Sequence, residues 1–254
     1  MSIDNNSINW DSFYKAFEDR FRGSFEEIKD RLRFYIPILK KNKVDKNLGS
    51  VLDLGSGRCE WLELLRDSGI SAQGVDMNPC SVEIGIQRKL NIEVGDIFNY
   101  LSQIPEESFG AVTAFHVIEH LNWKDQLILI QEAYRVLNPG GVLIIEWPNP
   151  ESIYVATKNF WIDPTHIKLV PQELLSFMAE FTGFEQIEIK RFRPAVKDIP
   201  YKKKSSYLLE KLYNYLKDIL KSSLEMLNII TPFLTSGTDI AIIALKPNTT
   251  QKKQ

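Results

Sequence analysis

The chain has 254 residues, a formal net charge of −2, and apolar (44%) and charged (25%) fractions typical of a folded globular protein with one large domain and additions. The near-neutral charge gives no overall electrostatic reason to expect nucleic acid as a partner. Two cysteines without metal or disulfide spacing fit a reducing cytoplasm, and the polar N-terminus and short apolar runs predict neither a signal peptide nor a membrane span.

Residues 1–47 are predicted to form helices that precede the main domain and extend over its functional site. One helical face gathers aromatic side chains, namely Trp10, Tyr14, Phe17 and Phe21. A second apolar helical run extends over 25–36, and Pro37 with the lysine-rich stretch 40–43 is expected to lead from it to the first strand. Arg20 and Arg22 precede a break at Gly23, and guanidinium groups bind carboxylate or phosphate oxygens with two parallel hydrogen bonds. We expect one of these arginines to hold an anion; the alternative is an exposed, salt-bridged helix face.

A strand, a glycine turn and a helix start follow one another over residues 51–60. The strand ends at Asp53, and the turn is Gly55-Ser56-Gly57, whose glycines permit positive φ and close approach of a ligand. The turn lacks the Gly-Lys-Ser/Thr of a phosphate loop, and Glu60 stands where a dinucleotide fingerprint has its third glycine. An acid just before such a turn suits a ligand with a cationic amino group. The alternative is an ordinary turn that binds nothing.

Two further strands are predicted to end in acids at the same edge. Asp76 and Met77 follow the second strand, where an acid hydrogen-bonds the hydroxyls of a ribose. Asp96 and Ile97 follow the third, where an acid could accept from an adenine amino group. Together with Asp53, these residues predict an adenosyl-type ligand.

Alternating strands and helices predict a doubly wound, Rossmann-like α/β fold with a parallel sheet covered on both faces. The expected strands are 50–54, 72–76, 91–94, 109–115, 141–147 and 184–190, and the expected helices are 59–68, 79–89, 125–137 and 171–182. Asp239–Leu245 should close a seven-stranded sheet as an antiparallel last strand. Before it, residues 191–238 read as a basic helical insertion, and 248–254 read as a disordered tail.

All three histidines are expected at the ligand-binding edge of the sheet. His116 and His120 follow the fourth strand, and His166 lies in the long loop after the fifth, close to Asp163. A neutral imidazole oriented by a carboxylate can act as a base near neutral pH. Asp163 with His166 is our first candidate pair, and Glu119 with His120 is the second; structural or solvated histidines are the alternative.

In this order, the motifs resemble the class I S-adenosylmethionine-dependent methyltransferases. The resemblance covers roughly 48–190 and the last strand, and it includes the segments 116–121 and 135–141. It implies a methyltransferase domain over 48–247 with S-adenosylmethionine as cofactor. Together with the anion-binding argument for Arg22, it gives the expected cofactor-binding residues Asp53, Gly55, Ser56, Gly57, Asp76, Met77, Asp96, Ile97, His116 and Arg22. Cys59 replaces a glycine that is frequent in this family, and we expect its thiol to crowd the methionine end of the cofactor.

Two segments are similar to a narrower group. Asp163-Pro164-Thr165-His166 and the stretch 17–23 resemble methyltransferases of bacterial cell-surface polysaccharide synthesis, including O-antigen chain terminators. This resemblance implies methylation of a sugar hydroxyl, or of a phosphate on the sugar, of a glycan that can be lipid-linked. His166, Asp163 and His120 would then be catalytic, and the methyl group would cap the chain.

Two alternatives stay open. His116-x-x-Glu119-His120 is also similar to ubiquinone-biosynthesis O-methyltransferases, which use this region for a divalent metal, so the acceptor could be a small aromatic or quinone-like molecule. We assign no metal ligand on this basis. A cofactor-binding protein without turnover is the other alternative, with Cys59 as its main indication. The expected location is the cytoplasm, and the basic stretch 200–230 is a candidate contact for the inner membrane surface or a partner.

Overall fold

The computed structural model describes residues 8–192 and 237–248, which form a seven-stranded sheet in the order β3-β2-β1-β4-β5-β7-β6. The strands are β1 (Val51–Leu54), β2 (Ala72–Asp76), β3 (Ile92–Val94), β4 (Phe109–Phe115), β5 (Leu137–Pro148), β6 (Glu185–Phe192) and β7 (Asp239–Leu245). Strands β1 to β5 pair in parallel, whereas β7 runs antiparallel to both of its neighbours. The predicted sheet with one antiparallel last strand is therefore confirmed.

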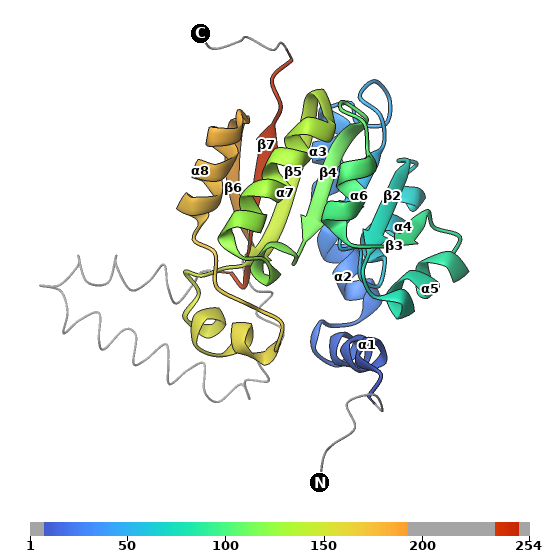
Figure 1. The fold of residues 1–254 in the computed structure, drawn as a ribbon, viewed down its shortest axis with the longest axis vertical. Helices are drawn as coiled ribbons and strands as arrows, with labels where there is room; N and C mark the ends of the chain where they lie inside the picture. The colour runs from blue at the N-terminus through green and yellow to red at the C-terminus, as the bar shows by residue number, and fades with distance from the viewer. Residues whose placement is uncertain (1–7, 193–236, 249–254) are drawn as a thin grey trace, which may run out of the picture.

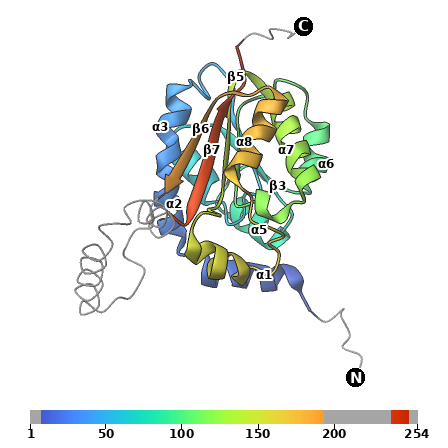
Figure 2. The same ribbon diagram turned by 90° about the vertical axis from the view of Figure 1, so that its left-hand side faces the viewer.

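Helices cover both faces of this sheet (Figures 1 and 2). They are α1 (Trp10–Phe21), α2 (Phe25–Leu32), α3 (Ile36–Lys41), α4 (Glu60–Asp67), α5 (Pro79–Gln87), α6 (Ile97–Gln103), α7 (Trp123–Val136) and α8 (Gln172–Thr182). Helices α6, α7 and α8 bury their apolar stripes in the core on one face, and α2, α3 and α4 do so on the other. The central strands β1 and β4 are buried along their whole length, as expected for strands covered on both sides.

Three local predictions were wrong. Helix α6 was not expected, but Asp96 caps it by accepting hydrogen bonds from the N–H groups of Phe98 and Asn99. Pro37 does not begin the connection to the first strand; it lies in the first turn of α3, where a missing N–H costs nothing. Strand β5 begins at Leu137 instead of 141. Residues 138–141, whose composition is typical of the end of a helix, are part of this strand, and Leu137 pairs with Phe109 of β4.

The carboxyl ends of the parallel strands meet at one end of the molecule, and two segments lie there (Figures 1 and 2). One is α1, and the other is a pair of helical turns after β5, η4 (Val155–Asn159) and η5 (Phe160–Ile162). None of the helices in the described part combines the length and hydropathy that spanning a bilayer requires. The predicted insertion, apart from its first two and last two residues, and the tail beyond 248 lie outside the described residues.

Candidate functional site

The glycine turn after β1 has the backbone that the sequence predicts. Gly55 and Gly57 have φ of +70° and +50°, in the left-handed region that favours glycine. A Cβ atom on Gly55 would lie 2.5 Å from Cγ2 of Val117, so no side chain fits there. The N–H of Gly57 donates to Oδ2 of Asp76 at 2.7 Å, which ties the turn to the end of β2. The turn and the second strand-end acid thus form one unit.

Cys59 also has a left-handed backbone, with φ of +71°, which explains why a glycine would be suitable at this position. Its buried side chain packs against Leu62, Val82 and Ile92, in the contact between α4 and α5. Sγ lies only 2.8 Å from where a Cβ atom on Gly85 would stand. The expected crowding of a ligand by this thiol is therefore not what the structure shows, because the thiol belongs to the helix packing.

The three strand-end acids differ in their surroundings. Asp53 is buried, and its Oδ1 accepts a hydrogen bond from the Thr113 hydroxyl at 2.7 Å. Burial raises the pKa of Asp53 to about 7, and a bound ammonium group would favour its ionised form. Asp76 also accepts from the N–H of Asn78 at 2.8 Å. Asp96 uses Oδ1 to cap α6, so a ligand there would meet its other carboxylate oxygen.

The remaining predicted residues around the turn have less direct roles. The Ser56 hydroxyl donates to the carbonyl of Asp53 at 3.2 Å and packs toward Gly74, so it supports the turn from behind. Met77 is largely exposed beside the end of β2, and Ile97 is half-buried as the first residue of α6. Met77 is therefore free to cover a bound ring, and Ile97 contacts the apolar core.

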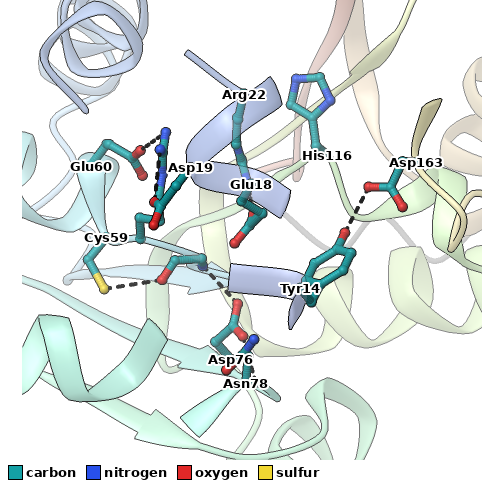
Figure 3. A network of polar contacts seen from close by, with 12 residues as sticks. Tyr14, Glu18, Asp19, Arg22, Cys59, Glu60, Asp76, Asn78, His116 and Asp163 are labelled. Atoms are coloured by element: carbon teal, nitrogen blue, oxygen red, sulfur yellow. Dashed lines mark hydrogen bonds and ion pairs between the residues drawn. The ribbon is translucent and has the colours of Figure 1, made fainter. Parts of the chain in front are cut away.

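Helix α1 covers the glycine turn with a charged pair (Figure 3). Nη1 of Arg22 donates to Oε1 of the buried Glu18 at 2.7 Å, and it lies 3.2 Å from where a Cβ atom on Gly57 would stand. Arg22 is therefore placed to bind an anionic group over the turn. Arg20 is exposed and lies over the ring of Phe21, so the structure separates the two arginines. The sequence analysis did not predict the partner of Arg22. Glu18 lies four residues before it, a spacing that favours an ion pair on a helix.

His116 belongs to a charged cluster between β4, β5, β7 and α2. Nη2 of Arg31 is 2.9 Å from Oε1 of Glu146, and Nη1 is 3.0 Å from Oδ2 of Asp239. Nε2 of His116 lies 3.5 Å from the same Glu146 oxygen, and Tyr35 donates its hydroxyl proton to the other one. Although burial opposes it, contacts with nearby carboxylates raise the pKa of His116 to about 9. These carboxylates favour the cationic form of His116 and so disfavour a role as base.

His120 and His166 lie side by side, with ring centroids 4.8 Å apart. Nδ1 of His166 is 2.6 Å from the carbonyl oxygen of Phe160, which can only accept, so Nδ1 carries the proton and Nε2 keeps its lone pair. Nδ1 of His120 is 2.9 Å from Oγ1 of Thr165, whose own proton goes to Asp163 at 2.6 Å. Thr165 Oγ1 therefore accepts a hydrogen bond from Nδ1 of His120. Burial lowers the pKa of His166, so its ring is neutral at neutral pH.

Asp163 does not orient His166 by a hydrogen bond, which corrects our expectation. Its Oδ2 is 3.8 Å from Nε2 of His166 and accepts instead from the hydroxyl of Tyr14 at 2.9 Å (Figure 3). Burial raises the pKa of Tyr14 well above its ordinary value, so this hydroxyl remains a donor. Asp163 thereby joins α1 to the loop after β5, and the Phe160 carbonyl orients His166.

Glu119 faces two histidines, but not the one that we paired it with. Its Oε1 is 3.2 Å from Nδ1 of His116 and 3.8 Å from Nε2 of His166, and its Oε2 is buried without a hydrogen-bond partner. The backbone N–H of Ile167 donates to the carbonyl of Glu119 at 2.9 Å and brings His166 to this position. The sequence could not show this contact, because 47 positions separate the two residues.

The metal set suggested by His116, Glu119 and His120 does not form. Ligand atoms of Glu119, His120 and His166 lie within 4.8 Å of one another, and those of His116, Glu146 and Asp239 form a second group. Both carboxylates of the second group already pair with the Arg31 guanidinium, whose charge disfavours a further cation. The first group offers two imidazole nitrogens and a carboxylate oxygen, donors that fit a divalent transition metal.

Comparison with known proteins agrees with this geometry. Residues 19–189 match the family described as "Methyltransferase domain". A solved S-adenosylmethionine-dependent methyltransferase from Archaeoglobus fulgidus is 32% identical, with a TM-score of 0.71, over 92% of this chain and all of that one. A probable S-adenosylmethionine-dependent methyltransferase of Mycolicibacterium smegmatis is 30% identical over 137 residues, 53% of this chain and 51% of the relative. A ubiquinone biosynthesis O-methyltransferase of Pseudomonas aeruginosa is 28% identical over 122 residues, 44% and 51% of the two chains.

The fold and the glycine turn define a nucleotide-type binding protein whose cofactor is S-adenosylmethionine. The chain belongs to the methyltransferase-domain family, because the match covers well over half of its length. It spans about half the length of the curated relatives that it matches. The residues at the turn fit the chemistry of the cofactor: the strand-end carboxylates can accept from ammonium, hydroxyl and amino groups, and Arg22, beside Gly57, can donate to a carboxylate.

Asp76→Ala is expected to weaken S-adenosylmethionine binding about 5- to 150-fold, corresponding to the roughly 1–3 kcal/mol that a charged hydrogen-bonding group contributes. The variant also removes the acceptor that holds the Gly57 N–H. Titration calorimetry measures the affinity, and thermal unfolding without cofactor checks the fold. Asp67→Ala, an exposed acid at the end of α4, is the matched control and should bind normally. Unchanged affinity in a folded Asp76→Ala protein would remove Asp76 from the cofactor site.

Proposed function

We propose that this protein transfers the methyl group of S-adenosylmethionine to an oxygen of a bacterial surface glycan, either a sugar hydroxyl or a phosphate on the sugar, and so caps the chain. The observation that carries the proposal is the adjacent pair of imidazoles, His120 and His166, each with Nδ1 in a hydrogen bond. Burial favours the neutral form of His166, which leaves a lone pair on its Nε2. An oxygen acceptor gains from a nearby base, because a hydroxyl is a poor nucleophile until it loses its proton.

In this proposal, one set of residues binds the cofactor and another transfers the proton. When bound, S-adenosylmethionine supplies a methyl group on a positively charged sulfur. Asp53, Asp76 and Arg22 bind and orient the cofactor, and positioning of this kind contributes much of the rate. Nε2 of His166 accepts the proton of the acceptor hydroxyl. Oxygens of Glu119 and Asp163, each 3.8 Å from that nitrogen, stabilise the imidazolium that results.

The choice of a sugar acceptor has separate support. Tyr14, Thr165 and Asp163 surround the histidines with hydroxyl and carboxylate groups, which suits a hydroxylated acceptor better than an aromatic one. The similarity of segment 163–168 to polysaccharide methyltransferases points in the same direction. If the acceptor is a phosphate, it is already ionised at neutral pH, and the two histidines would orient it without taking a proton.

A second candidate is methylation of a small aromatic or quinone-like molecule. One observation favours it, namely the grouping of Glu119, His120 and His166 as possible ligands of a divalent metal. These residues would hold the ion, and the ion would supply Lewis-acid activation of the acceptor oxygen. A binding protein without turnover is the third candidate, and the full burial of Cys59, whose thiol packs between α4 and α5 and donates to the Gly57 carbonyl at 3.5 Å, weakens the reason for it.

A radiolabelled methyl-transfer assay separates these candidates. The purified protein is given S-adenosylmethionine and either a lipid-linked glycan, its free oligosaccharide or a catechol, with and without a chelator. We expect label in the glycan and no effect of chelation. Label in the catechol that disappears on chelation supports the metal-dependent candidate. Cofactor binding by calorimetry without transfer to any acceptor supports the binding protein.

A further inference from the structure

Exposed tryptophans gather at one end of the molecule. All five tryptophans lie in the described residues; Trp61 and Trp147 are buried in the core, whereas Trp10, Trp123 and Trp161 are 59%, 54% and 65% exposed. Trp10 begins α1, Trp123 begins α7 just after β4, and Trp161 lies in η5 after β5. Helix α1, the start of α7 after β4, and the helical turns after β5 lie toward the carboxyl end of the sheet, where the candidate site lies (Figures 1 and 2). The exposed tryptophans are therefore carried by elements at the same end of the molecule as the candidate site.

The segment between β5 and Asp163 shows the chemistry of this surface most clearly. Val155 and Phe160 are buried and fasten it to the body, while Ile153, Tyr154 and Trp161 point to solvent, each at least 46% exposed. The indole N–H of Trp161 donates to the carbonyl of Ala156 at 2.8 Å, so the exposed part of this ring has no unsatisfied donor. No acidic residue occurs over 152–162. Residues 152–162 thus present an apolar, aromatic and acid-free face, bounded by Glu151, which pairs with Arg191, and by Asp163.

Cations accompany these aromatic rings. Nζ of Lys124 lies 5.7 Å from the centroid of the Trp123 ring, and Nζ of Lys158 lies 5.9 Å from that of Tyr154. Neither lysine forms a salt bridge with another residue of the described part. Tryptophan and tyrosine suit the boundary between water and lipid, because they combine a large apolar ring with a polar edge. Neighbouring lysines add attraction to anionic headgroups.

We propose that this aromatic rim, defined as Trp10, Trp123, Tyr154 and Trp161, seats the active-site end of the protein on a bilayer that contains anionic lipids. The aromatic rings enter the interfacial layer, and Lys124 and Lys158 contact the headgroups. The binding itself does not depend on the proposed function. The consequence of membrane binding rests on the proposed function: an acceptor carried on a lipid would reach the site directly from the membrane surface.

Cosedimentation of the full chain with lipid vesicles tests this proposal. Two vesicle types are compared, phosphatidylcholine alone and phosphatidylcholine mixed with phosphatidylglycerol. We expect the wild type to bind the anionic vesicles more tightly, and higher salt to reduce the difference. The double variant Trp10→Ser with Trp161→Ser should lower partitioning to both vesicle types at least tenfold. The double variant Lys124→Glu with Lys158→Glu should lower binding to anionic vesicles about fivefold or more per lysine, the factor that corresponds to ~1 kcal/mol per charge.

The matched control is Phe177→Ser with Phe181→Ser, two aromatic side chains on α8 that are 61% and 67% exposed. This control should bind vesicles like the wild type. Vesicle binding that survives in the double tryptophan variant would come from another segment and would overturn the proposal. So would a dimer that the tryptophan variants abolish, because the rim would then join two copies. Cofactor affinity by calorimetry should stay unchanged in every variant, which keeps this test independent of whether the proposed reaction is right.

Discussion

His166→Ala is expected to lower kcat by a factor of about 10²–10⁴ while leaving the dissociation constant of S-adenosylmethionine nearly unchanged. The ring is neutral, its Nδ1 proton is held by the Phe160 carbonyl, and its Nε2 faces two carboxylates at 3.8 Å, which would stabilise the protonated form. Steady-state kinetics gives kcat, and calorimetry gives the cofactor affinity. Asp163→Asn should give a milder loss, since Asp163 acts through Tyr14, Thr165 and its charge.

The pH profile distinguishes a base from a merely structural histidine. Burial lowers the pKa of His166, so the wild-type rate should be constant through neutral pH and fall only at pH values below the ordinary imidazole pKa. His116→Asn is the control: asparagine tolerates the left-handed backbone at this position, and the acid-side fall in rate should persist. A rate that stays constant down to about pH 5.5 would exclude a histidine base and favour an ionised phosphate as the acceptor.

Glu146→Ala is expected to lower the free energy of unfolding by about 3–5 kcal/mol, the cost of leaving buried charges without a partner. Glu146 is fully buried in β5, and its two oxygens contact Arg31, His116 and Tyr35. Urea unfolding measures the change. Glu188→Ala is the matched control, because Glu188 also makes an ion pair from a strand, with Lys190, but is 60% exposed. It should cost at most about 1 kcal/mol. Equal losses in the two variants would contradict the role assigned to the buried cluster.

The same cluster predicts how stability depends on pH. Although burial opposes it, the charge of Arg31 and the contacts with His116 and Tyr35 lower the pKa of Glu146 from 4.5 to about 2. Its contribution is therefore present above about pH 4.5 and is lost as pH falls toward 2. The pKa of His116 is raised from 6.5 to about 9, so its contribution is present below pH 6.5 and is lost as pH rises through 9. The difference in stability between wild type and Glu146→Ala should be largest between pH 4.5 and 6.5.

The amino-acid sequence by itself determined the sheet and the cofactor turn. Apolar runs that end in Asp53, Asp76 and Asp96 are local patterns, and parallel connectivity brings such ends to one edge regardless of the details of packing. The glycine turn is equally local, since positive φ at Gly55 and Gly57 is a property of those residues. Helix α6 was missed because its seven residues are few and its start depends on a capping acid that we had assigned only to ligand binding.

Only the tertiary structure decided how the histidines are used. Sequence proximity suggested that His116, Glu119 and His120 act together, and that Asp163 orients His166. The fold keeps Glu119 beside His116 but adds Glu146 and Asp239 to the surroundings of His116. It turns Glu119 toward His166 as its second histidine. The physical reason is that a loop residue takes its partners from whatever element packs against it, and those elements are distant in sequence. Arg31 on α2 and Tyr14 on α1 are examples, because each reaches a strand end or loop more than 100 positions away.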